Sequence, residues 1–341
     1  MERSGIICGG TICIDVNKVI DRFPPQEHVA RILEEMPDCG GPGLNMAIDL
    51  ARLGAPFPIE VIGIVGDDAH GRIALDTCRE LGIGSGRIAV VPGGRTSYTD
   101  VMIVAEGGRR TFFHQEGVNA LLEAGHFDFA GSTAKIVHVG SPGVHARMDA
   151  PQGNGNGNGN GFSEVLARAR ATGHRTNLEL VGVAGDRLRD LALPCLPLLD
   201  SIIINESEAT ALTGVETHRD GRPDWARVED AAVALIRMGV STLAVVHFPD
   251  GVVAADRDGR LWRQGAAWVP PERIKSTNGA GDALASGVML GLHEGWPVEK
   301  GLRLGVCVAA LSLGSYSTSR GIPSAEECFA YGEKAGFKPT S

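Results

Sequence analysis

Four residues in the last third of the chain, Gly279-Ala280-Gly281-Asp282, stand directly before an apolar, helix-like segment. Small residues at a helix N-terminus leave backbone N–H groups open to an anion, and the helix dipole adds positive potential there. A carboxylate at Asp282, beside such an anion hole, has the chemistry of a general base. It would take the proton of a hydroxyl group that attacks a phosphoryl group. The alternative is a tight glycine turn in which Asp282 only caps the helix.

A second glycine-rich stretch, at residues 40–45, also opens a predicted helix and reads Gly-Gly-Pro-Gly-Leu-Asn. It has neither the Lys-Ser/Thr pair of a Walker loop nor the spacing of a dinucleotide fingerprint, and both of those functions are therefore excluded for it. Its glycines would allow a small polar ligand to lie against the backbone. Asn45 would offer such a ligand both a donor and an acceptor. A plain glycine-rich helix entry is the alternative.

The elements that must position these residues are indicated by short apolar runs alternating with helical patterns. The predicted strands are residues 5–8, 59–65, 98–104, 135–139, 175–178, 201–204 and 243–246. The predicted helices are residues 44–53, 163–172, 228–238, 283–292 and 298–313. Because several of the strands are β-branched at nearly every position, both of their faces are expected to be covered. The pattern predicts an α/β fold with a mostly parallel central sheet and helices on both faces.

Two more polar segments, residues 15–38 and 95–116, interrupt this alternation with turn signals and short strand-like runs. We expect them to form a small antiparallel β lid on a single domain that spans residues 1–341. An apolar lid face predicts a homodimer formed through the lid; the residues assigned to it are Tyr98, Val101, Ile103 and Phe112. Residues 151–161 contain a Gly-Asn repeat, and they are predicted to form a flexible surface loop because such a repeat buries too little to offset its ordering entropy.

Composition excludes several classes of function. The 341 residues are 43% hydrophobic and 21% charged, which is enough to form a buried core. The formal charge is −9, and this argues against a protein whose main task is to bind nucleic acid or a membrane surface. Seven scattered cysteines without a Cys-x-x-Cys pair predict buried, reduced thiols. With no signal peptide or membrane span recognised, a cytoplasmic location is expected.

Taken together, the motifs resemble those of the ribokinase-like (PfkB) carbohydrate kinase family, in the same order and over essentially the whole chain. The segments that carry the resemblance are residues 10–15, 40–45, 65–71, 117–119, 205–208 and 279–282. The resemblance implies a ribokinase-like fold and a kinase that uses ATP and Mg²⁺. Its acceptor would be an alcohol group of a small sugar or sugar derivative.

The resemblance also implies a role for each matching residue. Asp282 would be the general base, while the N–H groups of Gly279, Ala280 and Gly281 would hold the developing phosphoryl charge. The implied substrate-binding residues are Asp15, Gly41, Asn45, His114 and Asn119. The implied nucleotide-binding residues are Asn205, Thr277 and Gly251. Asn205 and Glu208 would organise Mg²⁺, directly or through water.

Four positions depart from the family pattern. Ser276 stands where the family usually has an aspartate that helps to bind a monovalent cation, so the use of such a cation is left open. Phe248 stands at a position that is commonly glycine near the nucleotide. The usual Asp-x-Asn element of a central strand is here Asn177-Leu178-Glu179, and no role is assigned to its polar residues.

Other functions stay open at this point. A nucleoside kinase of the same fold is the first alternative, and a non-catalytic protein that binds a sugar or nucleotide is the second. Arg109 and Arg110 of the lid could meet a carboxylate or phosphate on the substrate, or they could be ordinary solvated charges. A dehydrogenase is excluded because the dinucleotide spacing is absent.

Overall fold

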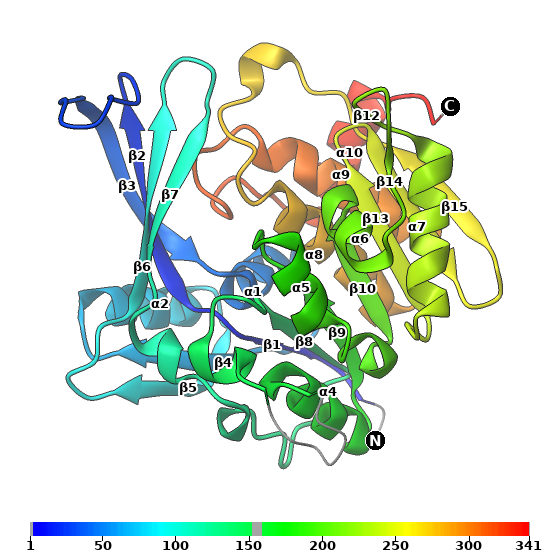
Figure 1. The fold of residues 1–341 in the computed structure, drawn as a ribbon, viewed down its shortest axis with the longest axis horizontal. Helices are drawn as coiled ribbons and strands as arrows, with labels where there is room; N and C mark the ends of the chain where they lie inside the picture. The colour runs from blue at the N-terminus through cyan, green and yellow to red at the C-terminus, as the bar shows by residue number, and fades with distance from the viewer. Residues whose placement is uncertain (1–2, 152–158, 341) are drawn as a thin grey trace.

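The computed structural model describes residues 3–151 and 159–340, in which a nine-stranded sheet forms the centre of the molecule (Figure 1). Its strand order is β15-β14-β13-β10-β9-β8-β1-β4-β5. The strands from β13 to β5 pair with one another in parallel, whereas β14 pairs with β13, and β15 with β14, in antiparallel fashion. The strands are β1 (Ile6–Gly9), β4 (Ile59–Gly66), β5 (Gly84–Val91), β8 (Ile136–Gly140), β9 (Arg175–Glu179), β10 (Ser201–Asn205), β13 (Leu243–Phe248), β14 (Gly251–Asp256) and β15 (Leu261–Gly265).

A second sheet of four strands stands to one side of the body (Figure 1). Its strands, in the spatial order β3-β2-β6-β7, are β2 (Cys13–Ile20), β3 (Ile32–Gly40), β6 (Ser97–Val104) and β7 (Arg110–Gln115). The two segments predicted as a lid supply these strands. The outer pairs are antiparallel as predicted, but the central pair, β2 with β6, is parallel. We call this sheet the lid.

One of the four residues predicted for the apolar lid face, Tyr98, lies on the other face of the lid, so the prediction is wrong for that residue. Val101 pairs directly with Phe112 across β6 and β7, so the two side chains share a face with Ile103. Tyr98 is an odd number of positions from Val101 along β6 and therefore lies on the opposite face. Val101 and Ile103 are fully buried within the chain, while Phe112 is about half exposed.

Helices cover both faces of the large sheet, as the strand composition predicts. They are α1 (Pro42–Arg52), α2 (Ala69–Glu80), α3 (Ala146–Asp149), α4 (Gly161–Ala171), α5 (Gly185–Ala192), α6 (Glu206–Thr213), α7 (Trp225–Arg237), α8 (Ala280–Glu294), α9 (Val298–Ser312) and α10 (Ala325–Ala335). Ile6 and Cys8 of β1 belong to a core shared with α1, α8 and α9. Ile7 belongs to the core on the other face, with α4, α6 and α7. Successive side chains of one strand therefore pack into the two cores on opposite faces of the sheet.

All seven predicted strands are present within two residues of their predicted ends, and the five predicted helices are present within three. Helices α2, α3, α5, α6 and α10 and strands β5, β14 and β15 were not predicted; α2, for example, buries only Gly71, Ala74 and Cys78 and so lacks a broad apolar stripe. The hairpin of β11 (His218–Arg219) and β12 (Arg222–Pro223) was also not predicted.

The cysteines are buried and none forms a disulfide, in agreement with the prediction of reduced thiols. Within the described part of the chain, every helix is too short or too polar to cross a membrane. Most of the predicted Gly-Asn loop, residues 152–158, lies outside the described residues.

Candidate active site

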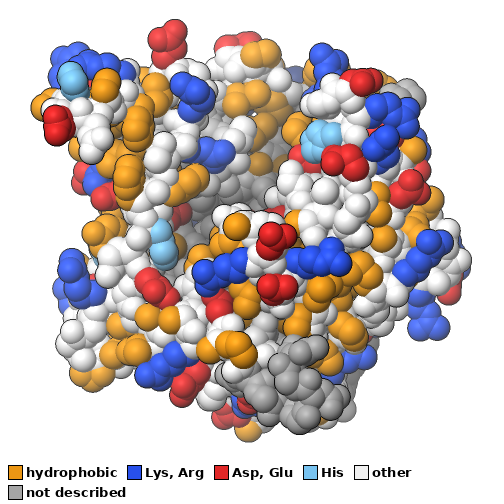
Figure 2. Space-filling view, viewed as in Figure 1, with side chains coloured by type: hydrophobic (Ala, Val, Ile, Leu, Met, Phe, Trp, Pro, Cys, Tyr) orange, Lys and Arg blue, Asp and Glu red, His pale blue; other side chains and the backbone are white. Residues whose placement is uncertain are grey.

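The predicted site residues gather where the lid meets the body, beside a hollow that is visible in the space-filling view (Figure 2). The carboxyl ends of β8, β9, β10 and β13 all point to this edge of the large sheet, because these strands are parallel. The N-termini of α1 and α8 reach the same region, and helix α1 contacts α8 directly. Ligands of open α/β sheets bind at this kind of edge.

The glycine-rich start of α8 is the predicted anion hole. Gly279 is left-handed, with φ of +73°, and a Cβ there would lie 2.9 Å from the carbonyl oxygen of Thr318. Glycine is therefore required at this position both for its conformation and for the close approach. The first i→i−4 hydrogen bond of the helix runs from Ala283 N to Gly279 O, at 2.8 Å. The Ala280 amide donates to the carbonyl oxygen of Thr277 at 3.5 Å, whereas the amides of Gly281 and Asp282 precede the first helical bond, as the first N–H groups of a helix do.

Asp282 presents its carboxyl group beside these amides. The Nδ2 of Asn45 donates to its Oδ2 at 2.7 Å. Burial raises the pKa of Asp282 well above its usual range, and the negative charge of Glu179 raises it further. Asn45 is itself held, because Thr318 Oγ1 donates to its Oδ1 at 3.4 Å. Asn45, which the resemblance implies as a substrate-binding residue, thus donates a hydrogen bond to Asp282, the candidate base, in this structure.

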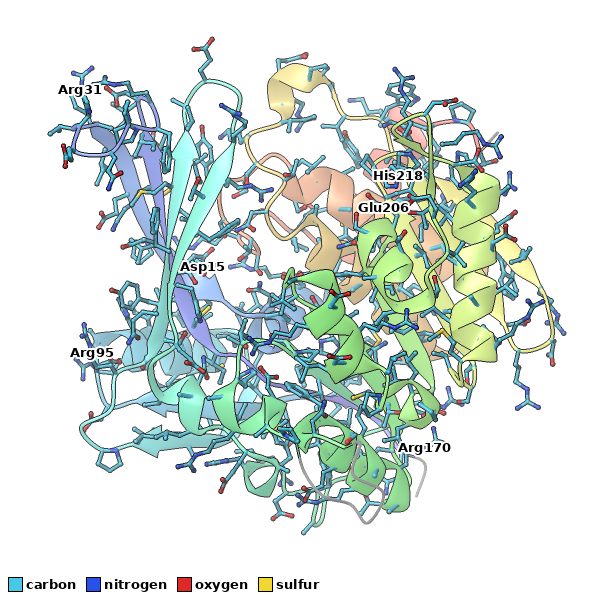
Figure 3. The ribbon with its side chains drawn as sticks, viewed as in Figure 1. Asp15, Arg31, Arg95, Arg170, Glu206 and His218 are labelled. Carbon is cyan, nitrogen blue, oxygen red and sulfur yellow. The ribbon has the colours of Figure 1, made fainter. Side chains whose placement is uncertain are left out.

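The lid contributes a polar row that faces the same region. Asp15, Thr99 and His114 lie opposite one another on β2, β6 and β7, so their side chains share one face. Thr99 Oγ1 and His114 Nδ1 are hydrogen-bonded at 3.0 Å. Burial raises the pKa of Asp15 to about 6, and the charges of Asp38 and Asp282 contribute to that rise. Figure 3 places Asp15 where the lid joins the body.

The two other substrate-binding predictions lie close to the same strands. Gly41 is the N-cap of α1 in a left-handed conformation, with φ of +91°, and its carbonyl accepts from Asn45 N at 2.9 Å. Asn119 is buried and donates from Nδ2 to the carbonyl of Ile12 at 3.0 Å. Its Oδ1 has no hydrogen-bond partner within residues 3–151 and 159–340. That oxygen is a buried acceptor with no partner among the described residues.

Asn205 and Glu208, the predicted magnesium residues, form a reciprocal cap at the start of α6. Asn205 Oδ1 accepts from Glu208 N at 2.8 Å, and Glu208 Oε2 accepts from Asn205 N at 3.0 Å. Burial raises the pKa of Glu208 to about 7, and the charges of Asp282 and Glu206 also raise it. The capping bonds leave Glu208 Oε1 as a remaining carboxylate oxygen.

Thr277, a predicted nucleotide residue, meets the lid. Arg110 Nη2 of β7 donates to Thr277 Oγ1 at 2.6 Å. Both residues line a cleft of about 860 Å³ between the lid hairpin and residues 271–277, which also contains Arg109. Ser276 is buried, and its hydroxyl accepts from Asn278 N at 3.0 Å. The lid arginines therefore lie beside the loop that leads into the anion hole.

Gly251, the remaining nucleotide prediction, is buried at the start of β14. A Cβ at this position would meet the ring of Trp225 at 2.6 Å, so packing alone requires glycine here. Phe248 packs edge-on against the same ring, at 4.7 Å between centroids. These contacts tie both residues to the core under α7, and no described contact joins either of them to Asp282.

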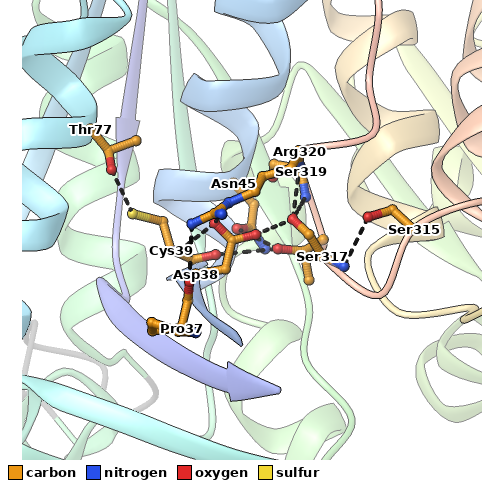
Figure 4. A network of polar contacts seen from close by, with 10 residues as sticks. Pro37, Asp38, Cys39, Asn45, Thr77, Ser315, Ser317, Ser319 and Arg320 are labelled. Atoms are coloured by element: carbon orange, nitrogen blue, oxygen red, sulfur yellow. Dashed lines mark hydrogen bonds and ion pairs between the residues drawn. The ribbon is translucent and has the colours of Figure 1, made fainter. Parts of the chain in front are cut away.

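A polar network links the lid to the loop behind Asp282 (Figure 4). Asp38, near the end of β3, accepts from the Nε of Arg320 at 3.1 Å and from the hydroxyl of Ser317. Thr318 Oγ1 also contacts the carbonyl oxygen of Cys39, at 3.2 Å. The end of β3 and the loop of residues 315–320 are thus joined immediately beside Asn45.

Sequence reasoning missed three residues of this region. The negative charge of Glu179 raises the pKa of Asp282, although the sequence motif gave Glu179 no role. The ring of His247 lies 3.3 Å from where a Cβ of Gly281 would be, and burial lowers its pKa to about 4. Thr99 joins Asp15 to His114. The alternation of β6 could have found Thr99, whereas nothing in the sequence places Glu179 or His247 beside α8.

Comparison with solved structures shows that the chain has the ribokinase fold. A ribokinase from Arabidopsis thaliana, solved with ribose and ATP, superposes with a TM-score of 0.76 at 19% identity, covering 97% of this chain and 99% of that one. A Burkholderia thailandensis nucleoside kinase in complex with inosine superposes with a TM-score of 0.71 at 18% identity, covering 98% and 100% of the two chains.

A family model described as pfkB family carbohydrate kinase matches residues 3–325. The chain belongs to this family and is a carbohydrate kinase. A 5-dehydro-2-deoxygluconokinase of Clostridium perfringens is 24% identical over 339 residues, which cover 95% of this chain and 91% of the relative. The ketohexokinase of Mus musculus is 23% identical over 318 residues, covering 92% and 97% respectively.

Proposed function

We propose that this carbohydrate kinase transfers the terminal phosphoryl group of ATP to an alcohol group of a small sugar or sugar derivative, with Asp282 as the general base. The observation that carries the proposal is the position of Asp282 beside the open amides of α8 and close enough to Asp15 to raise its pKa. The carboxyl group of Asp282 therefore lies between backbone amides of α8 that can bind an anion and polar lid side chains that can bind hydroxyl groups.

The catalytic step follows from this arrangement. A hydroxyl oxygen held near Asp15 attacks the terminal phosphorus while Asp282 takes its proton, and the bond to ADP breaks. The amides of Gly281 and Asp282 stabilise the charge on the phosphoryl oxygens, and the Ala280 amide joins them if it leaves its 3.5 Å bond to Thr277. Arg110 brings a positive charge to the same loop when the lid lies against Thr277, as it does in this structure. Lid contact also excludes water, which would otherwise compete with the sugar.

The kinase family implies a magnesium ion with the nucleotide, and the residues present fit one. Asn205 and Glu208 offer hard oxygen donors, and the pKa of Glu208 is raised by burial and by neighbouring negative charge that a cation would relieve. Because the capping bonds occupy one oxygen of each side chain, contact through water is expected. When bound, the ion neutralises phosphate charge.

The relatives suggest which acceptors to test. Two of the named relatives act on a keto sugar acid or a ketose, so the panel holds 5-dehydro-2-deoxygluconate, fructose and ribose, with inosine and adenosine as nucleosides. ADP release is measured with each acceptor. We expect turnover with a sugar or sugar acid. Turnover with nucleosides alone would replace the sugar assignment, and binding without any phosphorylated product would overturn the kinase proposal.

The base is tested by Asp282→Asn. We expect kcat to fall by about a hundredfold to ten-thousandfold while calorimetry still detects ATP binding. Asp186→Asn is the matched control, because Asp186 is an exposed carboxylate in the first turn of another helix, α5. Near-parental ADP production by Asp282→Asn would refute the role of base.

A further inference from the structure

Asn17, in the middle of β2, carries a buried amide that the fold itself does not satisfy. The residue is 1% exposed, and neither Nδ2 nor Oδ1 has a hydrogen-bond partner within residues 3–151 and 159–340. A buried donor or acceptor without a partner destabilises the folded state, and native proteins keep few such groups. The amide of Asn17 therefore calls for a partner from outside the chain.

Strand register places Asn17 on the face of the lid that carries the predicted substrate residues. Asn17 follows Asp15 by two positions, so the two side chains point the same way and their Cα atoms are about 6.6 Å apart. The row that contains Asn17 is completed by Met36 of β3, Val101 of β6 and Phe112 of β7. These three side chains are apolar and offer the amide no partner.

The rows on both sides of Asn17 contact the body of the protein. In the row nearer the root of the lid, Asp38 accepts from Arg320 Nε at 3.1 Å. In the row nearer the tip, Arg110 donates from Nη2 to Thr277 Oγ1 at 2.6 Å. The face that carries Asn17 is therefore turned toward the body, between these two contacts.

The same space holds other polar groups of the candidate site. The cleft of about 860 Å³ reaches the row of Asn17, because Phe112 is among the residues that line it. Just before β2, Asn119 donates to the carbonyl oxygen of Ile12 and leaves its own Oδ1 as a second buried amide atom without a partner in the described chain. Unpartnered polar atoms therefore lie on both sides of Asp15, near the start of β2 and in its middle.

We propose that Asn17 is a specificity-determining residue that binds two neighbouring hydroxyl groups of the sugar, one row farther toward the lid tip than Asp15. Its Nδ2 donates to the oxygen of one hydroxyl, and its Oδ1 accepts from the other. Because Asp15 and Asn17 are about 6.6 Å apart, an acceptor that contacts both extends over several carbon atoms, as a six-carbon sugar does. This role rests on the proposed function, in which the reacting hydroxyl lies near Asp15 and Asp282.

The role gives Asn17 opposite effects on stability and on substrate recognition. In the free enzyme the unpartnered amide destabilises the lid, and in the complex the sugar hydroxyls satisfy it. A site of this kind discriminates against an acceptor that lacks the hydroxyl, because the buried amide is then left without a partner. A residue with only a packing role would not link the two effects.

The test uses Asn17→Leu, which keeps the approximate size of the side chain and removes both polar atoms, in the full-length enzyme with ATP, Mg²⁺ and the acceptors of the panel. KM for the best sugar acceptor should rise about tenfold to a hundredfold, because two hydrogen bonds are lost, while kcat and KM for ATP stay within about threefold. The Tm of the free enzyme should rise by about 1–4 °C. With single-deoxy analogues of that acceptor, the penalty of Asn17→Leu should shrink for the analogue that lacks a contacted hydroxyl.

Asn160→Leu is the matched control, because Asn160 is also buried but both of its polar atoms are bonded. Ser163 N donates to its Oδ1 at 3.0 Å, and its Nδ2 donates to the carbonyl oxygen of Leu191 at 2.8 Å. Asn160→Leu should lower Tm and keep the parental KM for the acceptor. Met36→Leu changes an apolar residue in the row of Asn17 and should keep both.

Calorimetry of acceptor binding gives the same comparison without turnover. An unchanged acceptor affinity in folded Asn17→Leu overturns the inference. A loss of the same size for the acceptor and for every deoxy analogue also overturns it, since that pattern indicates a steric effect of leucine. A lower Tm in Asn17→Leu would show that the amide is already bonded within the protein, with the same consequence. Failure of the parent to phosphorylate any sugar, or retained activity in Asp282→Asn, would instead overturn the proposed function.

Discussion

Asn45 donates a 2.7 Å hydrogen bond from Nδ2 to Asp282 Oδ2, joining the first helix of the chain to α8 across 237 positions of sequence. The two residues belong to the two glycine-rich helix starts, and each start is held close by contacts that a Cβ would obstruct. The bond occupies Oδ2 of Asp282 and leaves its Oδ1. The two motifs therefore lie side by side, and α1 orients the carboxylate that we propose as the base.

Removal of this donor should slow the chemical step. Asn45→Ala leaves the Asp282 carboxylate without its amide partner, so we expect kcat to fall about tenfold to a thousandfold. Thr318→Val removes the hydroxyl that lies 3.4 Å from Asn45 Oδ1 and 3.2 Å from the Cys39 carbonyl but leaves the Asn45 amide in place, so the loss of kcat should be smaller. Steady-state kinetics of the two variants checks the order. Equal kcat for Asn45→Ala and the parent would show that the bond does not orient the base.

The left-handed glycine before α8 can be tested against a glycine in the same conformation at the other end of that helix. Gly279→Ala puts a Cβ 2.9 Å from the Thr318 carbonyl, whereas Gly295, with φ of +66°, has open space around it. Both substitutions should cost about 1–2 kcal/mol of unfolding free energy from backbone strain. Only Gly279→Ala should also lower kcat and ATP affinity. Denaturant unfolding and calorimetry distinguish the two effects, and equal activity of both variants would contradict the anion-hole assignment.

Asp15 should make stability depend on pH. Its folded-state pKa is about 6, above the ordinary value near 4, so its protonated form is favoured by folding. That contribution is fully present below about pH 4 and is lost as pH rises through 6. Relative to Asp15→Asn, the parent should lose about 2 kcal/mol of unfolding free energy between pH 4.5 and pH 8. Urea unfolding at both pH values tests this, and parallel behaviour of the two proteins would refute it.

The homodimer inferred from the lid can be tested on the face that points away from the site. Phe113 and Ile32 are each about half exposed, and strand pairing places both on the face of Tyr98, not on the face of Asp15. Light scattering at micromolar concentration should give twice the chain mass, and Phe113→Ser with Ile32→Ser should give the monomer. Leu121→Ser, at an exposed apolar residue outside the lid, is the control. A monomeric parent would remove the proposal.

The sequence by itself determined the class of fold and the local parts of the site. Apolar runs covered on both faces predicted the strands, because a buried parallel strand has no polar face to show. The start of α8 could be read from four adjacent residues, since an anion hole and the carboxylate beside it belong to one turn. The same holds for the capping residues Asn205 and Glu208, which are three positions apart.

Only the tertiary structure decided which distant side chains act together. Asn45 contacts Asp282 because α1 packs on α8, and the charge of Glu179 raises the pKa of Asp282 because β9 ends at the same edge of the sheet. Tyr98 faces away from the site because the strand period is two, although its residue type matches its apolar neighbours. Local sequence encodes backbone conformation and burial. The electrostatic environment of a carboxyl group depends on chain crossings and sheet order, which no short stretch of sequence contains.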